Sequence, residues 1–461
     1  MKFGIHIMRG IPRYSVEKNT PVKGTNFRAS DIADKSSTCP WCPDMYGIDM
    51  QKPGAQEYYD SILELYASWG VDFIKVDDIS RPYSYAEIEA IRKAIDKTGR
   101  PILLSLSPGD TPLDAGQHPQ EHANMWRISD DFWDRWNSLK AMFVRLHNWS
   151  NLKCAGSWPD ADMLPFGKIE GGRPTNFTKD EQRTCMTLWC IARSPLILGA
   201  DMTNMDDWTL SLLTNREVLD VNQKSTNSRQ LFREGNLVAW VADIPGSKDK
   251  YLALFNAETA GVNLENTEGA AAASGKIGRE GAKSASLSAD IRGSKKIGLY
   301  VGDGGDGISY DHAVWLNPTL KGPKGELKLA SIPWEKASAG WGQPKVNSST
   351  DGAKIEGIGT HAASLIIWNL PEGYETFSAT VELADGCQDR GKAEFFVLTD
   401  SALNKEIPDE LELSVNLADL GFKGPVKIRD IWEGKDLGSF KGKFSRKLRS
   451  HASGLYRLSP R

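Results

Sequence analysis

Gly70-Val-Asp-Phe-Ile-Lys-Val-Asp77 is the segment of this 461-residue chain from which its fold class follows most directly. Its apolar residues predict a short strand, and the strand ends in two acidic residues, Asp77 and Asp78. The residues before it, from about 55 to 69, carry apolar side chains at helical spacing. A helix followed by a strand with a polar carboxyl end is the repeating unit of parallel α/β folds.

This alternation of strands and helices continues to about residue 222. Further strands are predicted at 1–8, 101–106, 124–128 and 195–198, and further helices at 87–97, 132–146 and 180–192. Strict succession of the two element types predicts parallel βα units. The two common arrangements are a doubly wound sheet and a (β/α)8 barrel.

The positions of the polar residues favour the barrel. They cluster at the predicted carboxyl ends of strands: Asp77 and Asp78, Ser105 and Ser107, Arg127 with Asp130 and Asp131, and Asp160 with Asp162. A barrel gathers such ends around one mouth, where its active sites lie. No GxGxxG or P-loop follows a predicted strand, which argues against a dinucleotide-binding sheet. We therefore predict an α/β chain with a TIM-type barrel over residues 1–225.

After about residue 225 the helical pattern ends and short alternating strands follow. Residues 259–289 are rich in Ala, Gly and Ser and are predicted to form a loop or linker. The remaining segments predict all-β structure, organised as two sandwiches.

Composition narrows the classes of partner. A net charge of −4 gives no reason to expect nucleic acid, and no run of about 18 uncharged apolar residues predicts a membrane span. The fifteen Trp residues fit sugar stacking, but they are also ordinary core material.

The cysteines do not form a metal-binding pattern. Cys39-Pro-Trp-Cys42 lacks a second Cys pair, which favours a local disulfide or free thiols over zinc.

Two carboxylates in this pattern suit glycoside hydrolysis. Retention of configuration requires a nucleophile and a general acid/base about 5–5.5 Å apart. Asp77 has Lys75 on the same strand face to keep it ionised, and Arg127 and Asp131 share a strand-to-helix turn. The alternative is that these residues are solvated loop carboxylates or helix caps, and Asp130 in particular suits an N-cap before Phe132.

At these positions the sequence resembles glycoside hydrolase family 27, the α-galactosidases and α-N-acetylgalactosaminidases, over roughly 1–260 and 405–461. The segment from Ser68 to Asp78 resembles the family's WGVDYLKYDNC strand, and Trp126 to Trp133 resembles its WR…D segment. Trp158-Pro-Asp-Ala-Asp-Met-Leu164 is similar to WNDPDML, and 188–196 is similar to the eighth-strand region LWAIMAAPL.

The resemblance implies roles for individual residues. Asp77 would be the nucleophile and Asp131 the acid/base, with Lys75 and Arg127 binding sugar hydroxyls. His6 falls where relatives carry a pocket Tyr, although a core histidine is an equal alternative. Asp160 and Asp162 would support the mouth. The implied mechanism needs no metal or organic cofactor.

A loop after the family's fifth strand separates its two substrates. Ser107 and Gly109 stand near the positions where α-galactosidases carry bulky residues. Small residues there leave room for a 2-acetamido group, which favours N-acetylgalactosamine over galactose.

Two departures from the family pattern affect these expectations. The family's first two strands have no counterpart, so the barrel is expected to be incomplete at its N-terminus. Ile79 also replaces the Cys that follows the nucleophile, so the family's usual disulfide from the Cys39 region is not expected.

The β-rich half resembles two known modules. Residues 226–287 and 401–461 are similar to the terminal sandwich of the family, and 288–400 resembles the NPCBM carbohydrate-binding jelly roll inserted into it. The resemblance rests on Lys296 to Trp315 and on Ile358 to Ala363. Asp303, Asp306 and His312 are candidates for a cation or glycan site, although plain Gly-Asp turns are the simpler interpretation.

We therefore expect a retaining exo-glycosidase that removes terminal α-linked N-acetylgalactosamine or galactose from glycans. The alternative is a non-catalytic glycan-binding protein whose barrel is a relic. The resemblance implies an extracellular or periplasmic full-length protein, although this chain shows no signal peptide.

Overall fold

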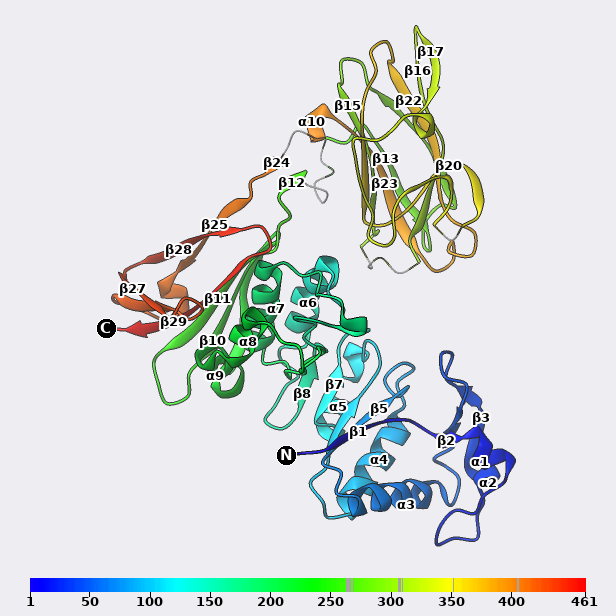
Figure 1. Cartoon of the computed structure of the whole chain (residues 1–461), viewed down its shortest axis with the longest axis vertical. Coiled ribbons are helices and arrows are strands. Elements are labelled where there is room, and N and C mark those ends of the chain that lie inside the picture. Colours follow the sequence, from blue (N-terminus) through cyan, green and yellow to red (C-terminus); the bar gives the residue numbers. More distant parts are fainter. Residues whose placement is uncertain (263–266, 268, 306–307, 309, 351, 404–405) are drawn as a thin grey trace. The chain divides into compact units, whose positions relative to one another are not determined.

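The structure is a computed structural model that describes residues 1–262, 267, 269–305, 308, 310–350, 352–403 and 406–461 (Figure 1). The chain divides into two compact units. The first comprises Met1–Ala257 and Leu411–Arg461, and the second comprises Glu258–Glu410.

The first unit is built on a parallel sheet with the strand order β1-β5-β6-β7-β8. Its strands are Gly4–Met8, Phe73–Asp77, Leu103–Leu106, Met125–Arg127 and Trp158–Asp160. The principal helices between and after them are α3 (Ala55–Ser68), α4 (Tyr85–Lys97), α5 (Gln117–His122), α6 (Trp136–Asn148) and α7 (Lys179–Ala192). Neighbouring strands of this sheet run parallel and are joined through helices, which confirms the predicted alternation of strands and helices.

Alternation along β5 separates the two faces of this sheet. Ile74 and Val76 are fully buried, whereas Lys75 and Asp77 point to the other, partly accessible face. The buried face packs on amphipathic helices such as α4, whose Ile88, Ile91 and Ile95 are completely enclosed. One face of the sheet therefore makes the core, and the other is free to carry polar side chains.

Two local predictions in this unit are corrected. Residues 195–198 form no strand, and only Leu198 makes an isolated parallel bridge, with Leu164. Pro195 at the start of this run has no N–H to donate to a ladder. The residues after β1 instead form a small sheet that the sequence did not predict, made of β2 (Ile11–Pro12), β4 (Met45–Ile48) and β3 (Ala33–Thr38), with the short helices α1 (Arg13–Glu17) and α2 (Ala29–Ile32).

The end of the first unit is an antiparallel sandwich. It follows helices α8 (Asp207–Thr214) and α9 (Arg216–Lys224). Its larger sheet has the order β27-β26-β29-β11-β10-β9, and β25 pairs with β28. The strands are β9 (Thr226–Glu234), β10 (Leu237–Asp243), β11 (Lys250–Asn256), β25 (Glu410–Asn416), β26 (Val426–Asp430), β27 (Lys435–Phe440), β28 (Lys443–Arg449) and β29 (Ser453–Pro460).

The second unit contains two five-membered layers of antiparallel strands, with one further strand at an edge. One sheet is β13 (Ala272–Gly278), β23 (Lys392–Thr399), β15 (Lys296–Gly302), β21 (Ser364–Asn369) and β18 (Lys336–Ser338) in spatial order. The other is β14 (Ser284–Asp290), β22 (Thr376–Leu383), β16 (His312–Gly322), β20 (Lys354–His361) and β19 (Lys345–Ser348), and β17 (Gly325–Lys328) pairs with β16. Short elements at the start and end of this unit are β12 (Gly261–Val262), α10 (Asp400–Leu403) and β24 (Glu406–Ile407).

The loop predicted over 259–289 is wrong where β13 and β14 form. Both strands pair within the second unit, β13 with β23 and β14 with β22. Backbone hydrogen bonds pair these strands whatever their side chains are. The Ala and Ser residues of β13 and β14 therefore gave no apolar pattern from which strands could be predicted.

The tryptophans serve mainly as core. Those enclosed almost completely are Trp126, Trp189, Trp240, Trp315 and Trp368, whereas Trp41, Trp69 and Trp341 are exposed. All six cysteines are free thiols, one of the two states expected for the Cys39–Cys42 pair. Among the helices of the described residues, none is long and apolar enough to cross a membrane.

Candidate active site

The carboxyl ends of the parallel strands bring most of the predicted polar residues to one edge of the sheet. In the sheet register His6 lies beside Lys75, and Lys75 lies beside Ser105. Two residues further towards the carboxyl ends of β1 and β5, Met8 lies beside Asp77. At the ends of β7 and β8, Arg127 lies beside Asp160. The register thus places residues distant in sequence next to one another, as the barrel-mouth interpretation required.

Asp77 is held as a carboxylate by groups on both of its oxygens. His6 Nε2 lies 3.3 Å from one oxygen, and the backbone N–H of Asp78 donates to the other at 2.9 Å. Burial alone would raise the pKa of Asp77, but the His6 hydrogen bond, the Asp78 N–H and the charge of Lys75 together lower it. His6 is therefore a partner of Asp77 and not a core histidine, because its side chain is 56% exposed.

A buried ion network fixes the backbone around Asp77. The Arg9 backbone N–H donates to the Asp77 carbonyl at 3.0 Å, and its guanidinium donates to the Asp78 carbonyl. The guanidinium also contacts the carboxylates of Asp78 at 3.1 Å and Glu87 at 2.8 Å, and Tyr59 donates to Glu87. These contacts hold Asp78 in its left-handed conformation, with φ 58°. Sequence reasoning missed Arg9, because no motif links it to partners about 70 residues away.

Arg127 organises the second group of carboxylates. Its buried guanidinium lies 3.3 Å from Asp131 and 3.0 Å from Asp162, and it donates to the Ser129 carbonyl at 3.1 Å. The Asp131 side chain is 73% exposed. Arg127 therefore steadies an acidic side chain that is accessible from solvent, at the predicted spacing of four residues.

Asp160 lies beside Arg127 in the sheet register and is almost completely buried. Burial and the neighbouring Asp162 raise the pKa of Asp160 to about 6, against the opposing charge of Arg127. Its carboxylate accepts the Asp162 backbone N–H at 2.9 Å. Lys75 acts electrostatically on both Asp160 and Asp77, so the two groups of carboxylates share one charged neighbour.

The loop with Ser107 and Gly109 is tied to the end of β5. Ser107 is buried, donates its N–H to Val76 and accepts from Ile79. Gly109 has φ 70°, and a Cβ added there would lie 2.9 Å from an Asp130 carboxylate oxygen. The space beside Gly109 is thus filled by Asp130 and its partner Arg81.

Asp130 is not a helix cap. Helix α6 begins at Trp136, six residues later, and Asp130 instead pairs with Arg81 at 2.7 Å. The backbone N–H of Phe132, which the predicted cap was to satisfy, bonds to Asp162 at 2.8 Å. A tertiary partner therefore replaces the expected local cap.

In the second unit, one of the predicted candidates lies beside an aromatic cluster. The His312 ring packs edge-on against Trp341 and His361, at centroid distances of 5.7 and 4.7 Å. Trp341 is 49% exposed. Asp303 accepts the Gly305 N–H at 3.0 Å, as in an ordinary turn, and Asp306 lies outside the described residues.

Three family models match this sequence. Residues 45–224 match the model described as Alpha galactosidase A, and 401–458 match the Alpha galactosidase C-terminal beta sandwich domain. Residues 263–321 and 325–410 match the NPCBM/NEW2 domain.

Individual relatives agree with these models. Alpha-galactosidase 2 of Arabidopsis thaliana is 30% identical over 216 residues, which are 46% of this chain and 52% of that protein. The alpha-N-acetylgalactosaminidase of Gallus gallus is 28% identical over 192 residues, or 38% of this chain and 44% of that one. This chain spans about half the length of such curated relatives.

Solved structures give longer matches. A GH27 β-L-arabinopyranosidase from Geobacillus stearothermophilus is 36% identical, with a TM-score of 0.65 over 100% of this chain and 75% of that one. A structure described as a putative alpha-N-acetylgalactosaminidase from Bacillus halodurans is 31% identical, with a TM-score of 0.61 over the same shares.

Proposed function

Since this chain belongs to glycoside hydrolase family 27, we propose that it is a retaining exo-glycosidase acting on terminal α-linked galactose-type sugars. Asp77 attacks the anomeric carbon while Asp131 gives its proton to the departing glycosidic oxygen. Asp131 then takes a proton from water, and the resulting hydroxide equivalent releases the sugar from Asp77. The observation that carries the proposal is the ionised, doubly hydrogen-bonded Asp77 at the end of β5.

The fold supports the spacing that this mechanism needs. Strands β5 and β7 are separated by β6 alone, so their axes are about 10 Å apart at roughly 4.8 Å per strand. Two carboxylates leaning towards each other across that gap can approach the about 5–5.5 Å of a retaining pair. We propose that the parallel sheet is an arc of a (β/α)8 barrel, the arrangement that gathers strand ends in this way.

The substrate is proposed to have the α-galactose configuration at the anomeric centre. The relatives are named for galactose, N-acetylgalactosamine and β-L-arabinopyranose, and these three sugars differ only in the substituents on a common pyranose ring. β-L-Arabinopyranose, for example, is α-D-galactopyranose without its hydroxymethyl group. Ser107, small and fixed beside β5, favours N-acetylgalactosamine in this proposal. Gly109 contributes less, because Asp130 and Arg81 occupy the space beside it.

The test is hydrolysis of three p-nitrophenyl glycosides: α-galactoside, α-N-acetylgalactosaminide and β-L-arabinopyranoside. Asp77→Gly should abolish turnover, and added azide should restore release with formation of the β-glycosyl azide, since azide replaces the missing nucleophile. Asp131→Asn should slow glycosides with poor leaving groups more than activated aryl glycosides. Asp96→Asn, an exposed acidic residue on α4, is the matched control and should behave as wild type. Full activity in Asp77→Gly would refute the assignment.

For the second unit we propose glycan binding at the aromatic cluster of His312, Trp341 and His361. An exposed Trp face beside two imidazoles suits stacking on a sugar ring with hydrogen bonds at its edge. Trp341→Ala should reduce retention on immobilised galactose-type glycans while leaving hydrolysis of a p-nitrophenyl glycoside unchanged. Trp69→Ala, which removes an exposed Trp of the first unit, is the control. Equal retention of both variants and wild type would refute this placement.

A further inference from the structure

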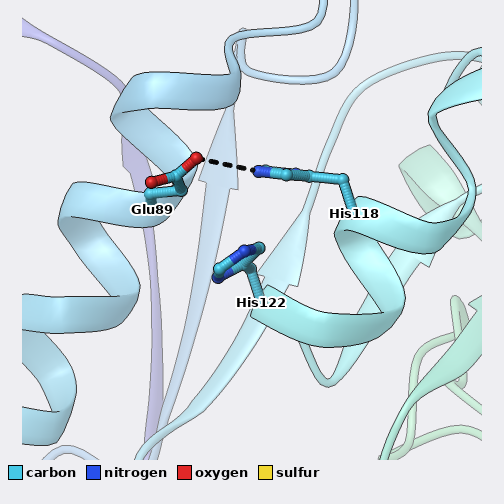
Figure 2. A group of neighbouring side chains, drawn as sticks. All are labelled: Glu89, His118 and His122. Atoms are coloured by element: carbon cyan, nitrogen blue, oxygen red, sulfur yellow. Dashed lines mark ion pairs between the residues drawn. The ribbon is translucent and has the colours of Figure 1, made fainter.

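Three side chains that could ligate a metal meet on helices α4 and α5, outside the residues used above. Glu89 comes from α4, and His118 and His122 come from α5 (Figure 2). Their ligand atoms all lie within 4.8 Å of one another. His118 Nε2 is 3.5 Å from Glu89 Oε1, and the two imidazole rings are 4.4 Å apart between centroids.

We propose that Glu89, His118 and His122 form a binding site for Zn²⁺ or a similar divalent transition-metal ion. The two histidines stand four residues apart, so they project from the same face of α5. Two imidazole nitrogens and one carboxylate oxygen are a donor set that zinc takes, with water as the fourth ligand.

The geometry needs little adjustment to receive the ion. Bonds of about 2.0–2.1 Å at tetrahedral angles put ligand atoms about 3.4 Å apart. Glu89 and His118 are already separated by 3.5 Å. The other separations between ligand atoms are at most 4.8 Å and must shorten towards this value. Rotation about the side-chain bonds of His122 can supply that change.

A neighbouring hydroxyl supplies the support that a metal-bound histidine usually has. Tyr83 Oη lies 2.9 Å from His118 Nδ1. With the Nδ1 proton donated to Tyr83, Nε2 keeps its lone pair and points at Glu89 and the proposed ion.

The ion would act as a clip between two segments and take no part in sugar chemistry. Helix α5 has six residues and follows the loop that carries Ser107. A helix this short is marginal without tertiary support. Joining it to α4 would stabilise the segment between β6 and β7 and so limit movement of that loop.

The experiment uses the full chain without an affinity tag, stripped with a chelator and titrated with ZnCl₂ in a calorimeter. We expect one zinc per chain, and Co²⁺ should give visible d–d absorption typical of tetrahedral coordination. His122→Gln and Glu89→Gln should each lose this binding, and Tyr83→Phe should weaken it about 10–100-fold. His147→Gln, an exposed histidine on α6, is the matched control and should bind as wild type.

Two further readouts separate this site from the Cys39–Cys42 pair and from a folding defect. The double variant Cys39→Ser/Cys42→Ser should retain the zinc. At a zinc concentration 100 times its Kd, the folding equilibrium constant of the wild type should rise about 100-fold, with no such rise in His122→Gln. Absence of binding in the wild type, zinc retained in His122→Gln, or zinc lost only with the thiols would overturn the proposal.

Discussion

The substitution Asp160→Asn should stabilise the protein near neutral pH and leave its stability unchanged in acid. Asp160 is completely buried and its pKa is raised to about 6 from an ordinary value of 3.8. At a pH between 3.8 and about 6, the Asp160 carboxyl group is protonated in the folded chain and ionised in the unfolded chain. Stability contributed by this group is therefore present below about pH 4 and is lost as the pH rises through 6.

The magnitude follows from the size of the shift. About two pH units at about 1.4 kcal/mol each give about 3 kcal/mol of destabilisation by the ionised group at pH 7.5. Asparagine has nearly the same shape and carries no charge at either pH. Its side-chain oxygen can still accept the Asp162 N–H, which now bonds at 2.9 Å. The variant should thus gain up to about 3 kcal/mol at pH 7.5 and almost nothing at pH 4.

The assay is chemical denaturation of variant and wild type at both pH values, followed by tryptophan fluorescence. Only the difference between the two proteins at each pH is interpreted, because every other titrating group is common to both. Asp96→Asn is the control and should change stability by less than about 1 kcal/mol at either pH, because the Asp96 side chain, which pairs with Arg92, is 65% exposed. An Asp160→Asn difference that is the same at both pH values would refute the reasoning.

Three other substitutions test the framework of the site. Arg9→Met should destabilise the protein by about 3–5 kcal/mol in denaturant unfolding, because two buried carboxylates lose their cation; a loss under about 1 kcal/mol would mean that the network is dispensable. His6→Gln should shift the acidic limb of the kcat/KM profile to higher pH, since His6 lowers the pKa of Asp77; an unmoved limb would remove His6 from the site. Thr178→Ala should cost about 1 kcal/mol of thermal stability, because Thr178 caps α7 by accepting the Glu181 N–H at 3.2 Å; Thr178→Ser should keep the cap.

The elements that the sequence predicted well are those with strong periodicity. Helix α3 and strand β5 fall where the apolar spacing placed them, because burial of one face imposes the same period on sequence and structure. Strands β13 and β14 were missed because Ala and Ser give no apolar signal, and their pairing comes from neighbours about 100 residues away. Pairing across such distances leaves no local pattern in the chain.

Candidate residues divide in the same way. Asp77 and Lys75 could be identified because a single strand fixes which side chains share a face. The pairing of Asp130 with Arg81 depends on a loop 49 residues earlier, so the local expectation of a helix cap was wrong. Arg9 could not be identified from the sequence for the same reason, although it donates hydrogen bonds to the backbone carbonyls of Asp77, the proposed nucleophile, and of Asp78.

The contrast between Asp77 and Asp160 explains why spacing alone left their roles open. Both follow the same rule of sequence, a carboxylate at the end of a parallel strand, yet the pKa of one is lowered and that of the other is raised. Asp77 gains an imidazole and a backbone N–H on a partly open face, whereas Asp160 is enclosed beside a second carboxylate. Ionisation therefore depends on the neighbours that the sheet register supplies. A nucleophile must be charged when substrate arrives, so among these two only Asp77 has the electrostatic setting that the proposed chemistry requires.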